Sequence, residues 1–106
     1  MPHYMIRANY TQQGIQGVMK DGAAGRVVAV EAMVGSVGGR LLSAYWAFGD
    51  DDFIGIAELP DNAAAMAIAA TVGASGTSSV STTVLLTASE VDEAIARKPT
   101  YRAPGS

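Results

Sequence analysis

The order of strand-like and helix-like segments constrains this chain more than any other feature. Alternating apolar residues and β-branched runs predict four strands, over residues 2–8, 40–48, 53–59 and 77–87. Apolar residues at helical spacing predict three helices, over residues 12–20, 22–37 and 62–71. The chain therefore divides into two strand–helix–strand halves, which a hairpin between the second and third strands joins.

This βαββαβ order is the split βαβ arrangement of a ferredoxin-like fold. We predict an α+β domain in which a four-stranded antiparallel sheet carries its helices on one face, because strand–helix–strand crossovers are right-handed. Ser89, with Asp92 three residues on, resembles a capping box and predicts a short C-terminal helix. We expect the domain to span residues 1–98, and residues 99–106 to form an extended or disordered tail.

Local signals predict where helices begin and how the second strand is oriented. Thr11, Asp21 and Asp61 are each expected to cap the N-terminus of a helix, and Gly38-Gly39 to end one. Strict alternation over residues 40–48 places side chains on two opposite faces. One face is expected to hold Leu42, Ala44, Trp46 and Phe48, and the other Leu41, Ser43, Tyr45 and Ala47.

The chain has few charged residues for its size. Of its 106 residues 16% are charged and 49% are hydrophobic, whereas about 25% are charged in a typical globular chain. Helices can cover only one face of the predicted sheet, yet the strands carry apolar or aromatic residues on both. We therefore predict a homo-oligomer in which the uncovered sheet face meets a second copy.

Composition also argues against several classes of function. The net charge is −3 and the seven Lys and Arg residues are scattered, so no nucleic-acid partner is expected. The absence of cysteine excludes disulfides and thiolate chemistry. The N-terminal residues lack the basic and apolar regions of a signal peptide, and no apolar stretch approaches about 20 residues. We expect a cytoplasmic protein without a membrane partner, a metal or another cofactor.

Five residues are candidates for chemistry or binding. His3, the single histidine, could act as a general base or a metal ligand, and Arg7 and Tyr10 are the other candidates for catalysis. Tyr10, Tyr45 and Trp46 could line a site for a small apolar or aromatic ligand, because their rings combine apolar area with a polar group. Packing in the core or at an interface is the alternative explanation for each of these residues.

Two groups of charged residues favour structural roles. Asp50-Asp51-Asp52 could bind a hard cation, but three consecutive residues in a tight turn do not converge on one ion, so we favour turn hydrogen bonds with Asp52 as the anchor. Arg7 and Glu58 lie in the middle of predicted strands, where an isolated charge is costly. We expect these two to pair.

Several segments resemble the GYD domain family. They are Asn9-Tyr10-Thr11 with Gly14-Ile15, the hairpin from Tyr45 to Phe53, Glu58-Leu59-Pro60-Asp61, and the closing residues 101–105. The family's glycine-x-tyrosine-aspartate pattern matches at Gly49 and Asp52 but departs at Asp51, where the family has tyrosine. The resemblance implies a ferredoxin-like fold related to the dimeric α/β-barrel proteins, and it implies no particular reaction.

Two classes of function follow from these expectations. In the first, the chain is a homo-oligomeric binding, sensor or assembly module that uses its uncovered sheet face. In the second, it is a cofactor-independent enzyme of the dimeric α/β-barrel type, oxygenase- or isomerase-like, with a pocket between subunits. A closed polar pocket around His3 or Arg7 would favour the enzyme, and a face filled by apolar packing would favour the module.

Overall fold

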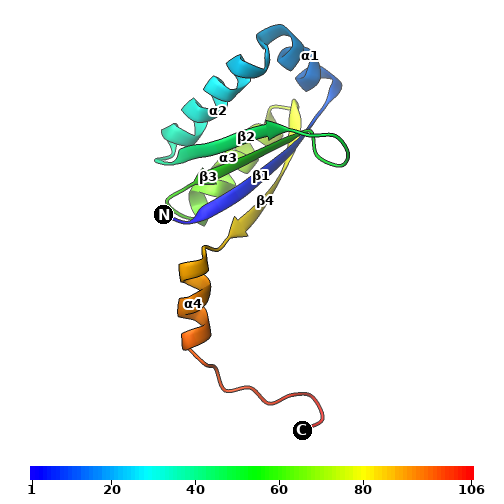
Figure 1. Cartoon of the computed structure of the whole chain (residues 1–106). Coiled ribbons are helices and arrows are strands. Elements are labelled where there is room, and N and C mark those ends of the chain that lie inside the picture. Colours follow the sequence, from blue (N-terminus) through cyan, green and yellow to red (C-terminus); the bar gives the residue numbers. More distant parts are fainter.

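The computed structural model describes residues 1–106 and has the predicted α+β, ferredoxin-like arrangement (Figure 1). Its elements are β1 (His3–Tyr10), α1 (Gln12–Asp21), α2 (Ala23–Ser36), β2 (Arg40–Trp46), β3 (Phe53–Glu58), α3 (Asn62–Ala74), β4 (Ser78–Leu85) and α4 (Ala88–Ala96). The four strands form one antiparallel sheet in the order β2-β3-β1-β4. None of the helices has the length and apolar character needed to cross a membrane.

The core lies between the sheet and the two helices α2 and α3. Alternate residues of the central strands, among them Tyr4 and Ala57, are buried on this helix-covered face. They pack against Val34 of α2 and Ile68 of α3. The Tyr4 hydroxyl is satisfied because it donates a hydrogen bond of 2.7 Å to Asn62 Oδ1 at the start of α3. Helices on one side leave the other side of the sheet uncovered.

The first connection contains a helix break that corrects one predicted cap. Thr11 caps α1 as expected, since its side chain accepts a hydrogen bond from Gly14 N. Asp21, however, is the last residue of α1 and does not cap α2; Gly22 occupies the N-cap position without a side-chain bond. Its φ of +78° is a conformation that glycine adopts readily. The backbone break therefore decides where α2 begins.

A β-bulge in β2 corrects the predicted faces of that strand. Leu41 is opposite Ala57 and Ser43 is opposite Ile56, so Leu42 is an extra residue in the ladder. Leu41 consequently faces the helices together with Ala44 and Trp46, instead of the opposite side. The strand also ends at Trp46, before Phe48.

The C-terminal helix is capped two residues before the predicted position, at Thr87 instead of Ser89. Thr87 accepts a hydrogen bond from Glu90 N, and the Glu90 carboxylate accepts one from Thr87 N at 3.1 Å. These bonds hold the pKa of Glu90 below its usual value. The predicted box at Ser89 and Asp92 is therefore wrong. The longer Glu90 side chain reaches back to the cap, which completes the box.

The C-terminal helix projects away from the sheet as an arm (Figure 1). We call residues 87–106 the arm. No residue of α4 is buried, and Ile95 is 66% exposed. The arm leaves the domain at the end of β4, which places it at the opposite end of the sheet from α1 (Figure 1).

Asp52 anchors the β2–β3 turn to β1, as predicted. Its side chain accepts a hydrogen bond of 2.9 Å from Tyr10 N, and its own N–H donates to Ala8 O at 3.0 Å. Asp51 instead lies 3.8 Å from Arg7, and Asp50 is exposed. The three carboxylates thus have separate surroundings.

Asp52→Ala is expected to destabilise the fold by about 1–2 kcal/mol, because the partly buried Tyr10 N–H loses its acceptor. Urea denaturation followed by circular dichroism measures this loss. Asp50→Ala removes the same charge from the same turn and serves as the matched control. Equal denaturation midpoints for the two variants would contradict the anchoring role.

Candidate functional site

The uncovered side of the sheet, which we call the open face, is defined by strand register. Residues directly opposite one another in the ladder share a face, so the partners of His3, Met5 and Arg7 identify it. From β2 to β4, the open face includes Arg40, Ser43 and Tyr45; Ile54, Ile56 and Glu58; His3, Met5 and Arg7; and Ser81, Thr83 and Leu85.

A three-residue ion cluster occupies the end of the open face near the arm. His3 lies opposite Glu58 in the ladder, and its Nε2 is 3.4 Å from Glu58 Oε1. Arg40, opposite Glu58 on the other side, places its Nη2 3.4 Å from Oε2. The carboxylate therefore lies between an imidazole and a guanidinium. His3 Nδ1 is buried and has no hydrogen-bond partner.

Arg7 holds the middle of β1 but does not pair with Glu58. Its Nη2 donates a hydrogen bond of 3.3 Å to Thr83 Oγ1, and its Nη1 lies 3.8 Å from Asp51 Oδ2. The predicted pair with Glu58 is wrong because the register places Ile54 opposite Arg7 and His3 opposite Glu58. Arg7 Nε is buried without a partner, which is a costly state for a charged group.

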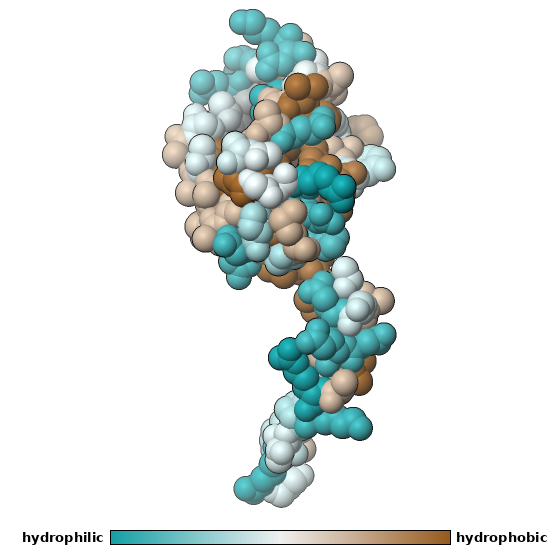
Figure 2. All heavy atoms as spheres, turned by 90° about the vertical axis from the view of Figure 1, so that its left-hand side faces the viewer, coloured by the Kyte–Doolittle hydropathy of each residue, from teal (hydrophilic) through white to brown (hydrophobic).

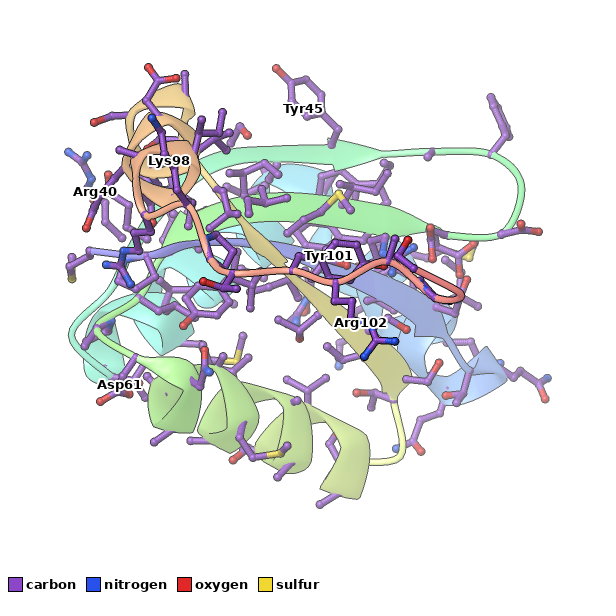
Figure 3. All side chains as sticks on the ribbon, turned by 90° about the horizontal axis from the view of Figure 1, so that it is seen from below. Arg40, Tyr45, Asp61, Lys98, Tyr101 and Arg102 are labelled. Carbon is purple, nitrogen blue, oxygen red and sulfur yellow. The ribbon has the colours of Figure 1, made fainter.

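Apolar side chains fill the space between these two polar groups. Met5 and Ile56 are direct ladder partners at the centre of the sheet, and Ile54 follows on the same face. All three are half-buried although no helix covers them. Tyr45, on the edge strand, projects away from α3 and is 68% exposed (Figure 3). The open face thus has an apolar centre with ionic groups towards both ends.

The structure places Tyr10 and Trp46 on the other side of the sheet. Trp46 packs edge-on against Phe53, with ring centroids 5.2 Å apart, and its Nε1 is buried without a hydrogen-bond partner. Tyr10 lies opposite Ser78, and burial raises the pKa of its phenol, although neighbouring Trp46 and Arg26 act in the opposite direction. The hydroxyl therefore stays protonated at neutral pH and can donate a hydrogen bond.

The candidate residues therefore form two groups and not one site. His3, Arg7 and Tyr45 share the open face, whereas Tyr10 and Trp46 border the helix side. Tyr45 and Trp46 are consecutive in a strand, so their side chains must point to opposite faces. Sequence reasoning also missed Arg26, which lines the helix side beside Tyr10. Its only sequence signal was that it is the single cation of a mostly apolar helix segment.

Fold and open face together define a ferredoxin-like α+β domain with an uncovered, partly apolar sheet. Comparison with protein families adds a more specific result. The sequence model of the GYD domain family matches residues 4–95, so the chain belongs to this family. The matched region includes most of α4 and all of the sheet except its first residue, His3. No curated protein and no solved structure matches the chain significantly.

Proposed function

We propose that this chain acts as a homo-oligomeric module in which the open face of one copy packs against that of a second. The observation that carries this proposal is the apolar centre formed by Met5, Ile54 and Ile56. An antiparallel sheet with one solvated face normally presents polar residues there. Association would remove these side chains from water and gain about 25 cal/mol for each Å² of apolar surface buried.

The mass in solution tests the proposal. Light scattering after size-exclusion chromatography should give at least twice the 10.9 kDa of one chain at micromolar concentration. A strictly monomeric protein over this range would overturn it.

The arm offers a second surface for the same assembly. Its helix presents apolar residues Val91 and Ile95 one turn apart, both exposed. Figure 2 shows apolar surface at the base of the domain and again on the arm, beside hydrophilic surface. Because a helix this short is marginal alone, we infer that the arm packs against a second copy of the chain.

Charge along the arm supports a second copy as its occupant. The helix carries Glu90, Asp92 and Glu93, while the following tail carries Arg97, Lys98 and Arg102. Only Glu93 and Arg97 pair within the chain, at 2.9 Å. Two arms lying antiparallel would place the acidic helix of each beside the basic tail of the other.

Ile95→Glu is expected to weaken association by about tenfold, because it removes apolar area and adds an unpaired charge to the arm. Ala96→Glu adds the same charge one position away and is the matched control. Sedimentation equilibrium at several protein concentrations measures both dissociation constants. Equal values would show that the arm does not take part in assembly.

A cofactor-independent enzyme of the dimeric α/β-barrel type is the second candidate. The pairing of His3 with Glu58 favours it, because a carboxylate beside an imidazole orients a general base. Such an enzyme requires a closed polar pocket around His3 or Arg7 in the assembled protein. A crystal structure of the oligomer separates the two candidates: apolar contact between Ile56 side chains supports the module, and an enclosed pocket supports the enzyme.

A further inference from the structure

A cavity separates the helices from part of the sheet. Its volume is about 80 Å³, and most of its lining is apolar, including Ile6, Val30, Met33, Phe53 and Ile68. The cavity exists because the helices present small residues: α3 is largely alanine and α2 is rich in alanine and valine. Gly55 adds to the effect, since the sheet carries no side chain at that point.

A larger, more polar cleft lies next to this cavity, beside α1. This cleft measures about 390 Å³, within the usual range for small-molecule sites. Four residues border both spaces and so mark their junction: Tyr10, Arg26, Val72 and Ser78. Together the two spaces have an apolar inner end and a polar outer end. This polarity matches that of an amphipathic ligand.

Arg26 is the only charged group at the junction. Its nearest carboxylate is that of Asp21, 3.9 Å away. Asp21 lines the outer cleft but not the inner cavity. Apart from this ion pair the guanidinium forms no hydrogen bond within the chain, so its N–H groups can still donate to a planar acceptor such as a carboxylate. Tyr10 stands beside it with a phenol that stays protonated, and Asp52 fixes its backbone.

We propose that this space binds a small amphipathic carboxylate, whose hydrocarbon part enters the cavity and whose carboxylate lies between Arg26 and Tyr10. The cavity side supplies only apolar contacts, which select a hydrocarbon. The junction supplies one cation and one hydroxyl donor, which select an anion over an alcohol. The site lies within one chain on the helix side of the sheet, so it does not depend on assembly through the open face.

Trp46 provides a direct measurement, because it is the single tryptophan and packs against Phe53, which lines the cavity. Hexanoate titrated into the protein should change the Trp46 emission in a saturable manner. Affinity should rise from butanoate to hexanoate by about fourfold for each added methylene. The absence of a saturable change with either acid in both fluorescence and isothermal titration calorimetry would overturn the proposal.

Arg26→Gln should weaken hexanoate binding at least tenfold and leave the binding of 1-hexanol unchanged. Arg40→Gln, which removes the same charge from the open face, is the matched control and should bind hexanoate like the original protein. Val72→Phe should fill the junction and abolish binding of both compounds, with circular dichroism checking its fold. Equal hexanoate affinities for the Arg26 and Arg40 variants would overturn the assigned site.

Discussion

Ile56→Lys is expected to dissociate the oligomer while leaving the domain folded. Ile56 lies at the centre of the open face, opposite Met5 on one side and Ser43 on the other. A lysine there would be buried between two sheets without a partner, which costs about 3–5 kcal/mol. That cost corresponds to roughly two to four orders of magnitude in the dissociation constant. In the separated chain the ammonium group would extend into water.

Met66→Lys is the matched control for this variant. Met66 is also a large exposed apolar residue, but it lies on α3, on the helix side of the domain. Light scattering gives the mass of each variant, and circular dichroism reports its fold. Persistence of the oligomer in Ile56→Lys, or equal dissociation of both variants, would remove the open face as the contact surface.

Gly14→Ala is expected to be the most destabilising small substitution in the chain. Gly14 is buried on α1, and a Cβ atom built there would lie only 1.8 Å from the Thr77 carbonyl oxygen. That carbonyl also accepts a hydrogen bond of 3.0 Å from Thr11 N, so the backbone before β4 is held close to α1. The methyl group must displace α1, at an expected cost of about 2–4 kcal/mol.

Gly17→Ala tests the same helix without the obstruction. A Cβ atom at Gly17 would meet nothing within 4 Å, so alanine should stabilise the fold by up to about 1 kcal/mol through its higher helix propensity. Urea denaturation midpoints for the two variants should therefore move in opposite directions. Loss of stability in both would mean that helix strain, and not the contact with Thr77, dominates.

The Gly14 contact also concerns the cleft, because Gly14 and Thr77 both line it. Displacement of α1 would change the cleft's outer wall while leaving the inner cavity intact. Gly14→Ala is therefore expected to alter the outer part of the proposed ligand site as well as the stability of the fold. It also explains why a glycine is suited to this position, where α1 approaches the backbone more closely than any side chain allows.

Most of the fold could be predicted because the strands alternate regularly and short local signals mark where helices begin. Alternation in β1 and the signals at Thr11 and Asp61 depend only on neighbouring residues, and the structure confirms them. One error arose where two local signals competed, and another where the backbone departed from regular strand geometry. At Thr87 and Ser89 two capping boxes overlapped, and in β2 a bulge at Leu42 reversed the side on which Leu41 lies.

The candidate site was harder to predict because its contacts join distant segments. His3 meets Glu58, and Arg7 meets Asp51 and Thr83, only because the strands pair in one register. A pattern along one strand does not determine that register. Arg26 is a similar case, since its place beside Tyr10 depends on how α2 crosses the sheet.

The sequence by itself determined the class of fold, the shortage of charge and the membership in the GYD domain family, because periodicity, composition and motifs are local or additive properties. Only the tertiary structure decided that the apolar centre and ion pairs of the open face lie together, and that Tyr10 borders a cavity on the opposite side. It alone showed that α4 projects free of the domain. Strand register, helix crossing and close backbone approach place these groups, and each depends on contacts between residues far apart in the chain.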